Sequence, residues 1–286
     1  MNQLAKLANR AGAGSAEMIF GTYLMSLATI AAGILDLIWR DFDPGHQPFG
    51  GLGYHLPGRV LFACIAGIWL AVAGLATLWP RTARLGTIAT AAIYLVFALL
   101  SLPHFYTMLH RYGFHLTLVL GLINQIFLQL IVVAGCMVLH SSRAPVTRRW
   151  SDRSHGAASL IARWSIGVCG ILTGIGHLAN TRALVSMIPK WMPLGASPWG
   201  ASLWVVISGI GFILAGLGIL SGILDLLAAR LLVLMLLIFE IILVPIILEH
   251  PHLHQAWGGT AYNLTVAGSV CIFAASIARR STSLSS

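Results

Sequence analysis

Long apolar stretches separated by short polar segments dominate this sequence. Most stretches approach the roughly 20 residues that a helix needs to cross the ~30 Å hydrocarbon core of a bilayer. They are continuously apolar, whereas a membrane β-strand alternates between apolar and polar positions over about ten residues. The pattern therefore predicts eight transmembrane helices, at residues 17–40, 60–79, 83–103, 115–139, 161–178, 201–220, 224–248 and 260–278.

Composition agrees with this pattern. Of the 286 residues, 58% are hydrophobic and 9% are charged, compared with roughly 45–50% and about 25% in an average globular protein. These values exclude an ordinary soluble enzyme, a disordered chain and a disulfide-rich secreted module. We therefore expect an all-α, polytopic membrane protein.

The 17 Lys and Arg residues predict the orientation, because cytoplasmic connections carry an excess of basic residues. With the N-terminus inside, the cytoplasmic set is Lys6, Arg10, Arg81, Arg84, Arg143, Arg148, Arg149, Arg153, Arg163, Arg230, Arg279 and Arg280. The outer set is Arg40, Arg59, Arg111, Arg182 and Lys190. Both termini are thus expected in the cytoplasm, with a bacterial inner membrane as the location. The net charge of +9 is explained by this topology and by anionic lipid headgroups, not by nucleic-acid binding.

The two halves of the chain resemble each other. Residues 65–68 and 73–75 match residues 207–210 and 215–217 at an offset of 142. Further matches, at offsets of 142, 139 and 137, are Phe97 with Phe239, Pro103 with Pro245, His110 with His252, His115 with His254, Asn124 with Asn263, and residues 33–35 with 170–172. An internal repeat at a fixed register is the signature of a duplicated unit.

The repeat divides the chain into an N-terminal cytoplasmic or interfacial segment (1–16), a first four-helix repeat (17–139), a basic cytoplasmic linker (140–160), a second four-helix repeat (161–278) and a cytoplasmic tail (279–286). Because each repeat has an even number of spans, the repeats are parallel, unlike the inverted repeats of many transporters. We expect two four-helix bundles side by side, with close helix contacts at Gly170, Gly174, Gly218 and Gly222.

Histidines concentrate at the predicted outer face, where we place His46, His55, His104, His110, His115, His177, His250, His252 and His254. The densest group is Glu249, His250, His252 and His254, which lie within six residues. Three interpretations stay open: an interfacial loop with no ligand, a metal or haem site built by the three imidazoles, and proton handling or quinone contact.

Other candidate groups lie within or beside the spans. His177 follows a glycine-rich helix face and precedes Asn180 and Trp191, so these three are candidates for binding a cofactor. Glu240 has no basic residue within a helical turn, and we expect it to be protonated or to meet a partner from another helix. Asp36 stands one turn before Arg40, and this spacing predicts an ion pair.

The second half also resembles a known family. Residues 174–177 read Gly-Ile-Gly-His, residues 187–193 read Met-Ile-Pro-Lys-Trp-Met-Pro, and a Pro-Trp pair at 198–199 precedes the glycine-rich run 209–220. This resembles the DoxX-like family of small four-helix membrane proteins over residues 161–278, and more faintly over 17–139. The family often has a glutamate three residues after the first glycine of its second span, where this chain has Phe212 and, in the first copy, Leu70.

The resemblance implies a subunit or accessory of a quinone-linked or other membrane redox system, with other subunits of such a complex as partners and quinone ahead of haem or metal as cofactor. In that hypothesis Glu240 relays protons and His177 binds a quinone oxygen or a cofactor. Two alternatives are a small-solute or ion pathway, against which the parallel repeats and the few intramembrane charges count, and a structural subunit without chemistry of its own. Whether the protein is itself an enzyme stays open at this point.

Overall fold

The part of the chain that the structure describes contains helices and connecting loops but no strands. The structure is a computed structural model that describes residues 2–48, 57–143 and 148–283. The predicted linker 140–160 and tail 279–286 are therefore covered in part, and His55 of the predicted outer histidines lies outside the described residues.

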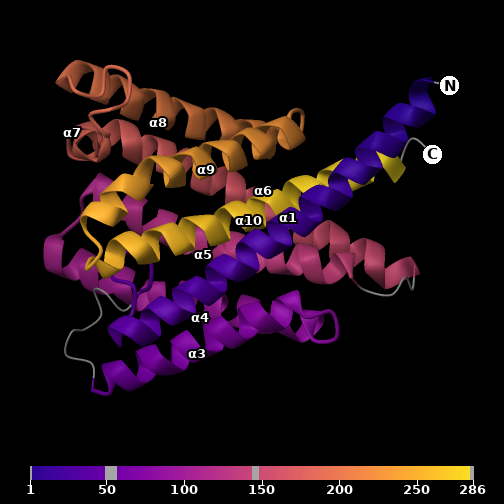
Figure 1. Cartoon of the computed structure of the whole chain (residues 1–286), viewed down its shortest axis with the longest axis horizontal. Helices are drawn as coiled ribbons and strands as arrows, with labels where there is room; N and C mark the ends of the chain where they lie inside the picture. The colour runs from indigo at the N-terminus through magenta and orange to yellow at the C-terminus, as the bar shows by residue number, and fades with distance from the viewer. Residues whose placement is uncertain (1, 49–56, 144–147, 284–286) are drawn as a thin grey trace.

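Eight long helices account for almost all of the fold (Figure 1). They are α1 (Asn2–Trp39), α3 (Arg59–Leu78), α4 (Ala83–Tyr112), α5 (Leu116–Ser142), α6 (Arg148–Ala179), α8 (Pro198–Ser221), α9 (Asp225–Glu249) and α10 (His254–Ser283). A short helix α7 (Thr181–Leu184) and a 3₁₀ turn η1 (Val185–Met187) connect α6 to α8. Each long helix contains a stretch that is long and apolar enough to cross a membrane, which confirms the eight predicted spans. The protein is thus a multi-pass integral membrane protein.

Several helices extend beyond the predicted spans, and α1 and α6 begin as early as Asn2 and Arg148. The span predicted at 83–103 continues to Tyr112, with Pro103 inside α4, and Pro245 likewise lies inside α9. A proline removes one backbone hydrogen bond but can leave the turns on either side helical. The span predicted to begin at residue 260 begins at His254 instead.

The long helices contact one another in a closed order. Each of α1, α3, α4, α5, α6, α8, α9 and α10 packs on the next, and α10 returns to pack on α1 (Figure 1). In addition α5 packs on α10 through the middle of the molecule. In the most apolar stretch of α10, 78% of the residues are buried, compared with 22% to 50% in the most apolar stretches of the other spans. α10 is therefore the central helix.

Glycines permit the closest helix crossings, because a side chain there would meet the facing backbone. A Cβ atom on Gly33 of α1 would collide with the carbonyl oxygen of Gly67 on α3, and one on Gly174 of α6 would collide with that of Gly209 on α8. The expected contact at Gly174 is therefore confirmed. Gly222 instead ends α8 in the left-handed conformation, with φ of +72°, so its expected role in a helix crossing was wrong.

These crossings also correct the sequence alignment of α1 with α6. Gly174 lies against Gly209 of α8 as Gly33 lies against Gly67 of α3, so by its contacts Gly174, and not Gly170, is the counterpart of Gly33. Asp36 and Leu37 lie against Gly67, whereas His177 and Leu178 lie against Gly209. The contact-based offset is thus 141, one helical turn more than the 137 predicted from residues 33–35.

Candidate functional site

The segment after α1 folds back into the helices. We call residues 41–48 the inserted loop. Arg40 has a φ of +52°, a left-handed conformation that usually falls to glycine, and the Asp41 amide donates to the Asp36 carbonyl at 3.3 Å. This arrangement ends the helix and turns the chain inward, so that Phe42 is 1% exposed and Asp43 is 4% exposed.

Two consecutive glycines of α10 make room for the inserted loop. A Cβ atom on Gly258 would lie 2.6 Å from the carboxyl carbon of Asp43. A Cβ atom on Gly259 would lie 3.2 Å from Cε1 of His46. Any larger residue at position 258 would therefore displace the Asp43 carboxylate.

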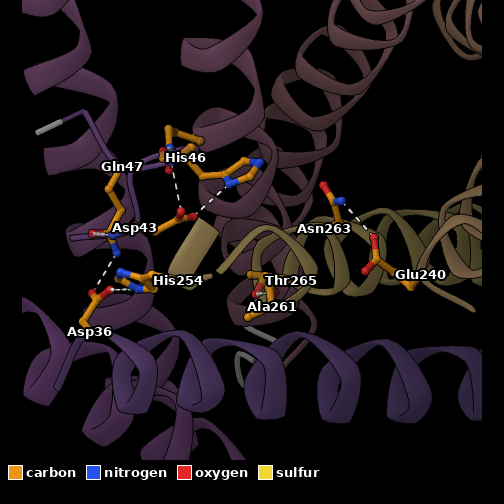
Figure 2. Close-up of polar contacts among 11 residues, drawn as sticks. Asp36, Asp43, His46, Gln47, Glu240, His254, Ala261, Asn263 and Thr265 are labelled. Atoms are coloured by element: carbon orange, nitrogen blue, oxygen red, sulfur yellow. Dashed lines mark hydrogen bonds and ion pairs between the residues drawn. The ribbon is translucent and has the colours of Figure 1, made fainter. Parts of the chain in front are cut away.

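Asp43 makes several hydrogen bonds within the inserted loop. Its Oδ2 lies 2.8 Å from His46 Nδ1, and its Oδ1 accepts a hydrogen bond from the Gly45 amide at 3.0 Å. The Asp43 amide donates to Gln47 Oε1 at 3.0 Å. The Gln47 amide group in turn donates to Asp36 Oδ2 at 2.8 Å, so one glutamine connects the two acidic residues (Figure 2).

Asp36 is 1% exposed and faces a histidine of another helix. Its Oδ1 lies 3.8 Å from His254 Nε2 (Figure 2). The His254 ring stacks on Trp39 at a centroid distance of 4.8 Å. Arg40 is exposed beyond the end of α1. The predicted Asp36–Arg40 ion pair was therefore wrong, because the left-handed residue ends the helix before the spacing of one turn can apply.

Three other helices hold the inserted loop in place. Gln129 of α5 donates to the His46 carbonyl at 2.7 Å, and Arg59 of α3 pairs with Asp41 at 2.5 Å. The His46 ring stacks on Tyr262 of α10 at 4.7 Å. The site thus depends on helices from both halves of the chain.

A small cavity separates the two acidic side chains. Its lining includes Asp36, Asp43, Gln47, Tyr94 and Tyr262, and its volume is about 10 Å³, about the space that one water molecule requires. The Tyr262 hydroxyl is buried and has no hydrogen-bond partner among the described residues. A water in this cavity has polar partners on several sides, which is the condition for stable occupancy.

Glu240 occupies a second polar position and is 6% exposed. The amide of Asn263 on α10 donates to Glu240 Oε1 at 2.8 Å, so the expected partner from another helix is Asn263 (Figure 2). Glu240 Oε2 is buried with no hydrogen-bond partner among the described residues.

His177 does not contact Glu240 directly. Its Nδ1 lies 2.9 Å from the Thr173 carbonyl on its own helix, and its ring lies 5.2 Å from Phe212. Phe212 contacts Phe239, the neighbour of Glu240 in sequence, at 5.9 Å. Phe212 and Phe239 thus connect His177 to the part of α9 that carries Glu240.

The other predicted site residues do not gather around His177. Asn180 and Trp191 are both exposed, and Asn180 donates to the carbonyl of Gly176 on its own helix. His250 and His252 are exposed as well, whereas His254 turns inward to Asp36. Over residues 2–48, 57–143 and 148–283, no three His, Cys, Asp or Glu side chains are arranged so that they could hold a metal ion.

Sequence reasoning missed the inserted loop. Asp43, Gln47, Gln129 and Tyr262 were not candidates, and His46 was only one of many outer histidines. One signal was available, since three of the eight acidic residues, Asp36, Asp41 and Asp43, fall within one short stretch.

Comparison of the chain with protein-family models, with curated proteins and with solved structures finds no match.

Proposed function

We propose that the protein is a DoxX-like integral membrane protein that binds and releases protons at the outer end of its helices, as a subunit or accessory of a quinone-linked or other membrane redox system. One observation carries the proposal. Two carboxyl groups line one cavity of about the size of a water molecule, and each lies beside an imidazole, Asp36 beside His254 and Asp43 beside His46.

Such a site suits a proton better than a larger ligand. Ionisable groups inside membrane proteins are costly and mark ion pathways and proton relays. In each pair a proton can reside on the carboxyl group or on the imidazole without changing the charge of the pair. A water between Asp36 and Asp43 would allow a proton to pass from one pair to the other. The same cavity is too small for an organic solute. We therefore prefer a proton site to a small-solute pathway.

The arrangement of helices supports the parallel repeat that this proposal assumes. Under the correspondence of α1, α3, α4 and α5 with α6, α8, α9 and α10, the contact of α1 with α10 corresponds to that of α6 with α5. The equivalent glycine crossings support the same symmetry. The excess of basic residues on one side supports cytoplasmic termini and puts the inserted loop at the outer face of the cell membrane.

Redox coupling rests on the resemblance to the DoxX-like family. Reduction of a quinone takes up protons with its electrons, and oxidation of the quinol releases them, so a proton site complements such a reaction. If His177 donates Nδ1–H to the Thr173 carbonyl, its neutral ring leaves Nε2 as an acceptor. We therefore assign His177 to a quinol hydroxyl rather than to a quinone oxygen, with Glu240 as the nearby proton carrier.

The test uses membrane vesicles from cells that lack the gene and carry either the wild type or a variant. Quinone reduction is measured with a panel of inorganic and organic electron donors. We expect at least one donor to require the protein, and we expect Asp36→Asn and Glu240→Gln to abolish that activity while the proteins still insert. Glu249→Gln, an exposed carboxylate near the same end, serves as the control.

The two parts of the proposal fail separately. If no donor requires the gene, the redox assignment is wrong, and solute flux or partner purification becomes the next measurement. If one donor requires the gene but Asp36→Asn and Glu240→Gln retain full activity, proton handling by these residues is wrong.

A further inference from the structure

A second hollow lies toward the opposite ends of the helices, between the start of the membrane-spanning stretch of α1 and the ends of α3, α5 and α10. Its volume is about 260 Å³, and its lining includes Arg143, Arg279, Tyr23, Thr22 and Ser142. Polar and apolar groups both line it, the apolar ones being Met18, Ile19, Leu78 and Leu139.

The polar lining offers positive charge and hydrogen-bond donors. The hydroxyls of Thr22 and Ser142 donate to carbonyls of their own helices, so they are not free to donate to a ligand. The other donors in the lining are the Tyr23 hydroxyl and the guanidinium groups. Among the described residues, the guanidinium of Arg143 donates one long hydrogen bond, from Nη1 to the Ala83 carbonyl at 3.5 Å.

The surroundings of Arg143 balance its positive charge only in part. Burial lowers the pKa of its guanidinium, and in the described part of the chain no carboxylate pairs with it. Two guanidinium groups line the same hollow, where an anion between them would contact both. Arginine matches the geometry of a phosphate group through paired N–H donors.

The apolar lining indicates that the anion belongs to a lipid. Ile19 and Tyr23 are 58% and 53% exposed on a face of α1 that belongs to a membrane-spanning stretch, so the hollow opens toward the lipid. A ligand there has acyl chains on one side and a phosphate on the other. Basic pockets at the cytoplasmic ends of transmembrane helices recognise anionic lipid headgroups in this way.

We propose that Arg143 and Arg279 bind the phosphate of an anionic phospholipid in the hollow between α1, α3, α5 and α10. This site is separate from the inserted loop and does not depend on the proposed redox function. The lipid would fasten the end of the central helix to three neighbours.

The experiment is native mass spectrometry of the detergent-purified protein with phosphatidylglycerol or phosphatidylcholine, together with thermal unfolding. We expect phosphatidylglycerol to remain bound and to raise the unfolding temperature, with phosphatidylcholine doing neither. Loss of one charge-assisted contact in Arg143→Gln should weaken phosphatidylglycerol binding about tenfold. Arg143→Lys should restore only part of it, because lysine lacks the paired donors.

Arg81→Gln is the matched control, since Arg81 is exposed at the same end of the helices and outside the hollow. It should bind phosphatidylglycerol as the wild type does. The proposal is overturned if Arg143→Gln retains wild-type binding, or if inorganic phosphate alone reproduces the stabilisation. It is also overturned if Arg143→Gln lowers the unfolding temperature equally with and without phosphatidylglycerol, which would show a purely structural role.

Discussion

Asp36 illustrates how a single buried acid is accommodated inside a membrane protein. Its carboxylate accepts the Gln47 amide on one oxygen and faces His254 with the other. Neither contact could be read from helical spacing, because Gln47 arrives by way of a turned loop and His254 comes from the far end of the chain. Local spacing predicted Arg40 instead, and the left-handed end of α1 removes that residue from reach.

The fit of Asp43 against α10 gives a prediction at the scale of one residue. Gly258→Ala should destabilise the protein by about 1–3 kcal/mol, because the new methyl group overlaps the Asp43 carboxylate. Equilibrium unfolding in mixed micelles measures this cost. Gly121→Ala is the control, since a Cβ atom at Gly121 meets no other atom within 4 Å.

A double-mutant cycle makes this prediction specific. In an Asp43→Ala background the overlap is gone, so Gly258→Ala should cost much less than in the wild type. Equal costs in the two backgrounds would show that the methyl group disturbs something other than Asp43.

At the scale of helices, the sequence predicts which segments form helices better than it predicts which helices pack together. Continuous apolar runs reveal all eight spans, because the bilayer fixes both their length and their composition. The contacts of α1 with α10 and of α5 with α6 join segments from different halves, and no local pattern encodes them. The predicted third span ends at residue 103, whereas α4 continues through Pro103 to Tyr112, because one missing hydrogen bond does not end a long helix in an apolar setting.

The crossing of α6 with α8 provides a test at the same scale. Gly174→Ala should destabilise the protein by about 1–3 kcal/mol, because its Cβ atom meets the Gly209 carbonyl and lies 3.0 Å from the Ile213 amide. Gly176→Ala, two residues away with nothing within 4 Å, should be neutral or stabilise by up to about 1 kcal/mol. Thermal unfolding of both variants in one detergent decides the matter, and equal losses would contradict the close crossing.

At the scale of the whole molecule, the central helix unites the two candidate regions. α10 carries His254 and Tyr262 beside the inserted loop and Asn263 beside Glu240, although most of its surface is buried. Adjacent residues of one helix therefore face different halves of the protein. Tyr262, which stacks on His46, and Asn263, which donates to Glu240, are neighbours in sequence, so α10 connects the two sites.

The sequence could reveal one part of the candidate site but not the other. Glu240 was identified because an acid inside an apolar span is conspicuous, and its need for a partner follows from desolvation. The inserted loop was not identified, because its acids lie outside the predicted spans and resemble an ordinary polar connection. Only the tertiary structure shows that two glycines of α10 admit them to the interior.

The most direct test of the proton site is an acid-minus-alkaline infrared difference spectrum of the purified protein in lipid. The account predicts a carboxylic C=O band that Asp36→Asn removes, that Gln47→Leu shifts because the bond to Asp36 is lost, and that Glu249→Gln leaves unchanged. An Asp36→Asn spectrum identical to that of the wild type at every pH would contradict it, because Asp36 would then not exchange a proton.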